Sequence, residues 1–293
     1  MTKAKVYLVG AGPGKADLIT VCGINAIAKA DCIVCDKLAN QALLKYAKAD
    51  AEIIAVPKRI GKGSFDQDQI NQIIIAKALA GKTVTRLKGG DPCIFGRGAE
   101  EAKVLVDAGI EFEIVPGITA AIAAAEYSGI MLTDRNYSSQ VVFVTGREAP
   151  GKEETSIDWD LLAKFRGTIV FYMGMENIEL IVSKLINNGM SPDTPAAIVS
   201  DATYASQMVL QTNLSQLVRQ SQQKKIMPPA LIIVGQAANC NSSLNWFMNK
   251  PMFGRNIVVT RDRKGNTDFA EKIIERAGNP VEFETISIKP MTQ

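Results

Sequence analysis

The chain has 293 residues, 47% hydrophobic and 22% charged, a composition typical of a folded globular protein long enough for two domains. Thirty-three Lys and Arg against 30 Asp and Glu leave a formal net charge of +3, well short of the basic surplus of nucleic-acid-binding proteins. Histidine is absent, which excludes Ser-His-Asp and Cys-His nucleophiles and imidazole metal ligands. A general base must therefore be a carboxylate, Lys, Tyr or Cys, and no metal site is predicted.

The N-terminal stretch and the cysteines indicate a cytoplasmic protein. MTKAKVYLVGAG has too short an apolar segment for a signal peptide, and no later run approaches the roughly 18 apolar residues of a membrane span. The five cysteines have no regular spacing and do not suggest a disulfide framework. Cys32 and Cys35 lie in the apolar run DCIVCD, where residues three apart face opposite sides of a strand, so we predict buried thiols.

The first 130 residues or so alternate strand-like and helix-like patterns. Strands are expected at 5–10, 31–36, 51–56, 82–87 and 112–117. Helices are expected at 17–30, 40–49, 67–81 and 99–109. This alternation predicts crossover units and a mostly parallel sheet, with ligands near the carboxyl ends of the strands.

The pattern breaks between residues 129 and 139, where a domain boundary is expected. A second set of strands is expected at 140–146, 167–174, 194–200, 207–212 and 228–235. The short turn between the third and fourth of these predicts a hairpin and a mixed sheet. Residues 245–255 resemble a linker, and a strand, a helix and a strand follow. The predicted fold is α/β with an N-terminal domain at 1–132, a second domain at 137–250 and a terminal segment at 251–293.

Two glycine-rich stretches follow strands of the first domain. GAGPG, residues 10–14, fits a dinucleotide-binding turn poorly, because the third glycine is missing and Pro13 removes a backbone amide. A tight strand-to-helix turn is the alternative interpretation. In RLKGGDPCIFGRGAEE, Gly89 and Gly90 allow a ligand close to the backbone, Asp91 offers a carboxylate, and two more glycines flank Arg97. A simple turn does not need this many glycines, so the second stretch predicts a ligand site.

VYLVGAGPG, RLKGGDPCIFGRGAEE, VPGITAAIAAAEYSGI and FYMG, in this order, closely resemble the motifs of the tetrapyrrole methylase family. The resemblance extends from about residue 4 to LNWF at 244–247. It implies two α/β domains with the active site in a trough between them, usually in a homodimer. The implied activity is transfer of two methyl groups from S-adenosyl-L-methionine to carbon atoms of uroporphyrinogen III. The implied products are precorrin-2, on the route to sirohaem and cobalamin, and S-adenosyl-L-homocysteine.

The resemblance also implies roles for individual residues. It places S-adenosylmethionine against Pro13, Gly89, Gly90, Asp91, Ile94, Thr119, Ala120, Met173 and Ala202. It marks Asp36 as proton acceptor and Lys58 as proton donor, both at strand ends. Because a sulfonium methyl donor carries its own leaving group, the protein needs mainly to bind and orient the reactants, and backbone and small side chains suffice for that.

The substrate's eight carboxylates are best met by Arg and Lys side chains. Candidates in or next to the implicated loops are Arg59, Lys62, Arg86, Lys88, Arg97, Arg135 and Arg147. Arg97 is the first choice, and Arg59 and Arg147 are also expected to contact substrate. The chain has Asp134 and Arg147 where members of the family usually have His, so Arg147 could strengthen carboxylate binding.

Residues 256–290 resemble the beginning of uroporphyrinogen-III synthase, but only one strand-helix-strand unit of it, so no synthase activity is expected. Three alternative functions remain at the sequence level. One is methylation of another ring by a member of the same family. A nicotinamide-dependent oxidoreductase would use GAGPG, and a nucleotide-sensing module would perform no catalysis.

Overall fold

The computed structural model describes residues 4–56, 66–148, 155–239, 242–261 and 263–286. The chain divides into two compact units, Met1–Ala123 and Ala124–Gln293. Within the described residues, no helix is both long and apolar enough to cross a membrane.

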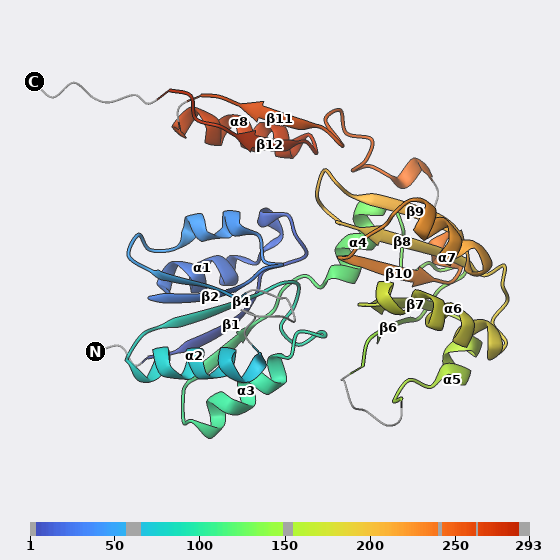
Figure 1. Ribbon diagram of the computed structural model, residues 1–293, viewed down its shortest axis with the longest axis horizontal. Helices are drawn as coiled ribbons and strands as arrows, with labels where there is room; N and C mark the ends of the chain where they lie inside the picture. Colours follow the sequence, from blue (N-terminus) through green and yellow to red (C-terminus); the bar gives the residue numbers. More distant parts are fainter. Residues whose placement is uncertain (1–3, 57–65, 149–154, 240–241, 262, 287–293) are drawn as a thin grey trace, which may run out of the picture. The chain divides into compact units, whose positions relative to one another are not determined.

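The first unit is a three-layer α/β structure around a parallel sheet in the order β3-β2-β4-β1-β5 (Figure 1). Its strands are β1 (Val6–Gly10), β2 (Cys32–Asp36), β3 (Glu52–Val56), β4 (Val84–Lys88) and β5 (Phe112–Val115). Its helices are α1 (Val21–Lys29), α2 (Gln67–Leu79), α3 (Gly98–Asp107) and the start of α4 (Ala120–Ser128). The parallel sheet confirms the expectation from alternating strand and helix patterns.

Alternating side chains of these strands enter two separate cores. Val34 packs in the core that contains α2, whereas Ile33 packs in the core that contains α1. Cys32 and Cys35 are buried in opposite cores, as predicted. Burial raises the pKa of both thiols.

Two expected helices differ from the structure. Residues 17–30 divide into a 3₁₀ turn, Ala16–Leu18, and helix α1, which begins after Thr20 because the Thr20 hydroxyl accepts from the Gly23 N–H at 3.1 Å. Within the expected helix at 40–49, only Gln41–Tyr46 is helical, as a short 3₁₀ helix that buries Leu43 in the core containing α1. Its i to i+3 hydrogen bonds end at Ala47, which is extended, so no longer helix forms.

The second unit contains a mixed sheet in the order β6-β7-β10-β8-β9. Its strands are β6 (Val141–Thr145), β7 (Thr168–Tyr172), β8 (Pro195–Ser200), β9 (Met208–Asn213) and β10 (Ala230–Val234). Helices α5 (Trp159–Lys164), α6 (Ile178–Asn187) and α7 (Leu214–Gln223) pack in one core with this sheet. Strands β8 and β9 form the predicted antiparallel hairpin, and the mixed sheet is confirmed.

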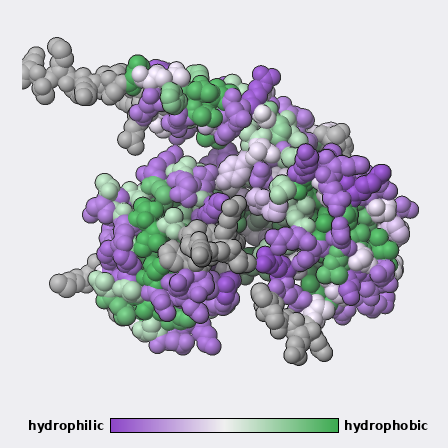
Figure 2. Space-filling model, viewed as in Figure 1, coloured by the Kyte–Doolittle hydropathy of each residue, from purple (hydrophilic) through white to green (hydrophobic). Residues whose placement is uncertain are grey.

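The C-terminal residues form β11 (Asn256–Val259), α8 (Arg263–Glu275) and β12 (Asn279–Glu282), with the two strands parallel. Helix α8 contributes Ala270 and Ile273 to a small buried cluster. Val258 and its partner Val281 are exposed, and hydrophobic residues are visible on this segment in Figure 2. This small unit leaves much of its apolar surface uncovered, as expected for so short a segment.

Candidate functional site

The two glycine-rich stretches meet at the carboxyl-terminal edge of the first sheet. They follow β1 and β4, which are neighbouring parallel strands, so both loops leave the same edge. The Gly90 N–H donates to the Gly12 carbonyl at 2.7 Å, and the Gly12 N–H donates to the Gly90 carbonyl at 3.2 Å. The Ala11 N–H also donates to the Lys88 carbonyl at 2.7 Å. Backbone hydrogen bonds therefore join two loops that are almost 80 residues apart.

A third loop, after β5, packs against these two without space for side chains. A Cβ added to Gly117 would lie 2.3 Å from the Gly90 carbonyl oxygen, and one added to Gly10 would lie 2.6 Å from the Gly117 Cα. Both neighbours are backbone atoms, so relieving either clash would require a shift of the main chain. Glycine is required at both positions because three backbones converge here. We call Gly10–Gly12, Gly89–Asp91 and Gly117 the backbone cradle.

The glycines of the second stretch have different roles. A Cβ on Gly96 or Gly98 would lie 2.6 or 2.5 Å from the Pro92 carbonyl oxygen, and one on Gly89 would lie 2.9 Å from the Leu38 Cβ. These three positions are closed by packing. Gly90 has a φ of +68°, and an added Cβ would have nothing closer than the Ala120 nitrogen at 3.8 Å and the Thr119 Cα at 3.9 Å.

Of the four glycines in this stretch, Gly90 is therefore the one where an added Cβ would fit, at ordinary van der Waals distance from Thr119 and from Ala120, the first residue of α4. The structure thus brings Gly89, Gly90, Thr119 and Ala120, four of the predicted cofactor residues, together at one edge of the first unit.

The Asp91 carboxylate holds two of these loops in place. Its Oδ1 accepts from the Cys93 N–H at 2.8 Å, and its Oδ2 accepts from the Gly117 N–H at 2.9 Å. Asp91 thus links the loop after β4 to the loop after β5. Sequence reasoning anticipated a ligand contact for Asp91 but not this bracing role.

The remaining predicted cofactor residues of the first unit lie in the same loops. Pro13 follows the cradle glycines after β1, and Ile94 is a half-exposed apolar side chain four residues after Gly90. Phe95 and Arg97, on either side of Gly96, have positive φ values of 53° and 60°. Such conformations cost energy for residues with a side chain and are concentrated at functional sites.

Four charged side chains lie just beneath this edge, on one face of the sheet. Arg86 and Lys88 of β4 are buried, and so is Glu101 of α3. The Glu101 Oε1 lies 3.0 Å from the Arg86 Nε, the Glu101 Oε2 lies 2.8 Å from the Lys88 Nζ, and the Arg86 Nη2 lies 2.5 Å from the Asp36 Oδ1. We call Asp36, Arg86, Lys88 and Glu101 the buried charge cluster.

This cluster corrects one expectation. Arg86 and Lys88 were considered as loop cations for substrate carboxylates, but both lie within β4 with their charges paired inside the protein. Burial and the neighbouring Arg86 charge lower the pKa of Lys88. The Asp36 and Glu101 carboxylates raise the pKa of Arg86 despite its burial.

Sequence reasoning did not identify Glu101. The signal was available in the helix periodicity, since Glu101 is one turn before Leu105, which is buried on the inner face of α3.

The other predicted residues of the first unit have mixed outcomes. Arg97 is exposed and forms a bidentate ion pair with Glu100, with nitrogen to oxygen distances of 2.9 and 2.6 Å. The Glu100 carboxylate raises the pKa of Arg97. Lys58, Arg59 and Lys62 lie outside the described residues. Asp36 is described, and the cation that contacts it is Arg86.

In the second unit, the predicted residues follow three strands that point the same way. Strands β6 and β7 are parallel, and β7 and β8 are both antiparallel to β10. Arg147, Met173 and Ala202 come directly after β6, β7 and β8, so they lie along the same edge of the second sheet. The Arg147 guanidinium lies 3.1 Å from Glu176, with both side chains exposed.

Strained backbone marks this edge as well. Met173 has a φ of 53°, and Asp201 and Thr203, on either side of Ala202, have φ values of 47° and 76°. Met173 also exposes 45% of its surface, which is unusual for a methionine directly after a buried strand. The second unit thus has strained loops where the resemblance places cofactor residues.

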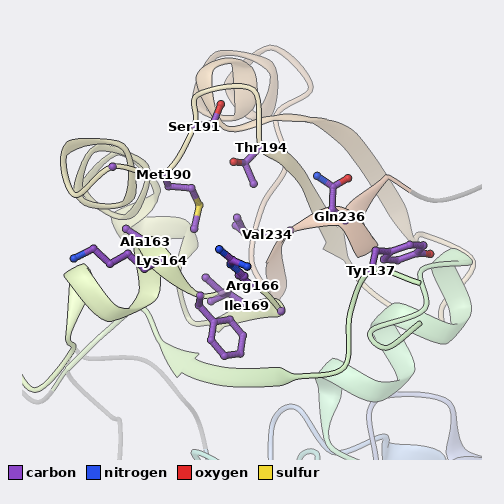
Figure 3. A pocket seen from close by; sticks show the side chains of 14 residues that line it. Tyr137, Ala163, Lys164, Arg166, Ile169, Met190, Ser191, Thr194, Val234 and Gln236 are labelled. Carbon is purple, nitrogen blue, oxygen red and sulfur yellow. The ribbon is translucent and has the colours of Figure 1, made fainter. Parts of the chain in front are cut away.

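A pocket of about 350 Å³ lies at the opposite edge of the second sheet (Figure 3). Its walls include Arg166 and Gly167 before β7, Thr194 before β8 and Gly235 after β10. None of the predicted site residues lines it. Of the described groups of His, Cys, Asp and Glu, none is arranged to hold a metal ion.

Both units are built on α/β sheets, and the backbone cradle of the first unit lies at a carboxyl-terminal strand edge, where α/β proteins commonly bind small molecules. The chain belongs to the family Tetrapyrrole (Corrin/Porphyrin) Methylases, whose profile matches residues 5–218.

Similar proteins include one described as an S-adenosyl-L-methionine-dependent uroporphyrinogen III methyltransferase from Methanosarcina barkeri. It is 45% identical over 240 residues, which are 82% of this chain and 94% of that protein. A Porphyrin biosynthesis protein HemD from Ruminiclostridium josui is 40% identical over 98% of this chain, and the match spans 57% of that longer relative.

Among solved structures, the uroporphyrin-III C-methyltransferase of Thermus thermophilus in complex with S-adenosylhomocysteine is similar in fold. Its TM-score is 0.68 at 30% sequence identity, and the match covers 80% of this chain and 93% of that one.

Proposed function

We propose that this chain is a methyltransferase that moves two methyl groups from S-adenosyl-L-methionine to uroporphyrinogen III, forming precorrin-2 for sirohaem or cobalamin synthesis. The observation that carries the proposal is the backbone cradle, in which Gly90 has room for a Cβ beside Thr119 and Ala120 while the other glycines of the stretch do not. The relative from Methanosarcina barkeri and the Thermus thermophilus complex supply the donor and substrate chemistry.

The cradle fits a donor of this kind because bare backbone at Gly90 lets a ligand approach closely, and a Cβ there would reduce the space beside Thr119 and Ala120. Gly89, Gly90, Thr119 and Ala120 would hold the donor by backbone contact, with Pro13, Asp91 and Ile94 in the surrounding loops. The family resemblance also assigns Met173 and Ala202 to the donor. When bound, S-adenosylmethionine supplies an activated methyl group with its own leaving group, so the protein needs no nucleophile of its own.

The chain's own residues then bind the substrate, orient it and remove a proton from it. Attack by a pyrrole carbon on the methyl group leaves a cationic ring that must lose a proton. Asp36, at the end of β2 and partly exposed, is the proposed proton acceptor. Lys58 is the proposed proton donor. Arg59, Arg97 and Arg147 are proposed to bind substrate carboxylates, for which Arg97 must exchange its exposed partner Glu100 for substrate.

The nicotinamide alternative fits the structure less well. A dinucleotide-binding turn places its glycines at the start of a helix. Here α1 begins at Val21, well after Gly14, and a three-residue 3₁₀ turn intervenes.

We also propose a location, an assembly and domain limits. Cys22, Cys32, Cys35 and Cys93 are unpaired, which favours a reducing compartment and therefore the cytoplasm. The family resemblance favours a homodimer, which light scattering would test. We retain the proposed limits at 1–132, 137–250 and 251–293, with the last resembling the start of uroporphyrinogen-III synthase.

Calorimetry and labelled turnover test the function. S-Adenosylmethionine and S-adenosylhomocysteine should bind in calorimetric titrations, whereas NAD should not. With methyl-labelled donor and uroporphyrinogen III, the product should carry two labels. Binding of NAD in place of the donor, or absence of label transfer despite donor binding, would contradict the proposal.

A further inference from the structure

Glu101 is the centre of the buried charge cluster. Its side chain is 1% exposed, and each of its oxygens lies next to a different buried cation, Arg86 or Lys88. Gln67, the first residue of α2, also donates to the Glu101 Oε1 at 3.1 Å. Burying charges is costly, so an arrangement of this kind needs close pairing throughout. Glu101 supplies that pairing for both cations of β4.

Asp36 is the member of the cluster that reaches the sheet edge. Its side chain is 24% exposed, and its Oδ1 accepts from the Arg86 Nη2. Its Oδ2 has no polar side-chain or backbone partner in the described part of the chain. One oxygen is therefore held by the buried Arg86, while the side chain as a whole is partly exposed at the end of β2, at the same sheet edge as the cradle.

We propose that Glu101 and Arg86 are positioning residues that hold the Asp36 carboxylate with one oxygen directed to the substrate. This inference rests on the proposed function, in which Asp36 accepts a proton. Arg86 bridges Glu101 and Asp36 through two different nitrogens, Nε and Nη2, and its Nη1 also donates to the Val34 carbonyl at 3.3 Å. The three hydrogen bonds fix the orientation of the Arg86 guanidinium. The bond from its Nη2 in turn fixes the orientation of the Asp36 carboxylate.

The charge of Glu101 is needed to keep the Asp36 carboxylate in place. Without it, Arg86 and Lys88 would be two buried cations, and Asp36 would be the remaining carboxylate of the cluster. Electrostatic attraction would then turn both Asp36 oxygens inward, away from the edge. Glu101 contacts both interior cations and offsets one of their two charges, so that Asp36 contacts the cluster through a single oxygen.

The proposal also requires arginine, and not lysine, at position 86. A lysine would keep the buried positive charge but could not contact Glu101 and Asp36 through separate, rigidly linked nitrogens. Arg86→Lys should therefore misplace Asp36 while disturbing the charge balance less than Glu101→Gln.

Steady-state kinetics of the full chain test the proposal. Glu101→Gln and Arg86→Lys should each lower kcat for methyl transfer by about tenfold or more, with the Kd for S-adenosylhomocysteine changed by less than about twofold. Leu105→Ala is the control for lost stability, because Leu105 is equally buried on the same helix face. Glu52→Gln is the control for charge, because Glu52 joins Lys77 and Lys82 at the other edge of the same sheet. Both controls should retain kcat within about twofold when assayed below their melting temperatures.

The double variant separates positioning from a merely structural role. If Glu101 acts through Asp36, Glu101→Gln should cause no further loss of kcat in an Asp36→Asn background. Multiplying losses, unchanged kcat in both single variants, or equal losses in Leu105→Ala would overturn the proposal.

A crystal structure of Glu101→Gln gives a readout independent of turnover. The Arg86 to Asp36 contact should be rearranged, with Asp36 turned toward Lys88, and an unchanged Asp36 would refute the inference. If Glu101→Gln does not fold, Arg86→Lys provides the same structural and kinetic tests. Absence of methyl transfer by the wild-type protein would contradict the proposed function, whereas the crystal structure would still decide whether Glu101 positions Asp36.

Discussion

Gly90 offers the sharpest test of the backbone cradle. Gly90→Ala adds one methyl group at a residue with a φ of +68°, where the nearest atoms are Ala120 N and Thr119 Cα at 3.8 and 3.9 Å. The protein therefore has space for the methyl group, but the backbone conformation is unfavourable by about 1–2 kcal/mol for a residue with a side chain. If the donor occupies that space, the added methyl group should weaken its binding by about tenfold or more, equivalent to roughly 1.4 kcal/mol.

Gly81→Ala is the matched control. Gly81 follows α2, has a φ of +82° and has nothing within 4 Å of an added Cβ, so it has the same backbone strain without the cradle. Urea denaturation should show a similar loss of stability for both variants. Calorimetric titration with S-adenosylhomocysteine should show weakened binding for Gly90→Ala alone. Equal binding by the two variants would mean that the donor does not use this space.

Three further outcomes are expected. Asp91→Asn should lower the free energy of unfolding by about 1–3 kcal/mol in urea denaturation, because its amide cannot replace both charge-assisted bonds to the Cys93 and Gly117 N–H groups; wild-type stability would contradict the bracing role. Iodoacetamide at pH 8 should label the exposed Cys22 but spare Cys35, whose pKa is raised by burial, and peptide mapping that finds both labelled would be inconsistent with the fold. The Lys48 ammonium and the Thr83 N–H lower the pKa of Asp31 below its usual 3.8, so its contribution to stability is present above that value and is lost as the pH falls through the lower folded-state pKa. Asp31→Asn should therefore melt below the wild type at pH 7, with the difference shrinking toward pH 3.

The local pattern of the sequence predicted most elements of the fold. The continuous apolar run at 32–35 is enough to predict a strand buried on both faces. Because residues three apart face opposite sides of a strand, Cys32 and Cys35 lie in opposite cores. The exception at 40–49 is instructive. Its helical spacing is real, but tertiary contacts of Leu43 favour a short 3₁₀ helix followed by extended backbone.

The site was only partly predictable. Gly90 was identified by the glycine-rich stretch that follows a strand, and Thr119 by its resemblance to a family motif. No local rule would have placed the two residues near each other. Glu101 was missed because a glutamate near the start of a helix is usually exposed, and its partners Arg86 and Lys88 lie on a strand instead of the same helix.

The sequence by itself determined where most strands and helices form, where glycine permits bare backbone, and which chemistry is impossible without histidine. Those properties depend on residues that are close together in the chain. The tertiary structure alone decided that the loops after β1, β4 and β5 converge on Gly90, and that Glu101 lies between two buried cations. These contacts depend on the order of strands in the sheet, and strand order is set by packing of the whole domain, which the local pattern of side chains does not specify.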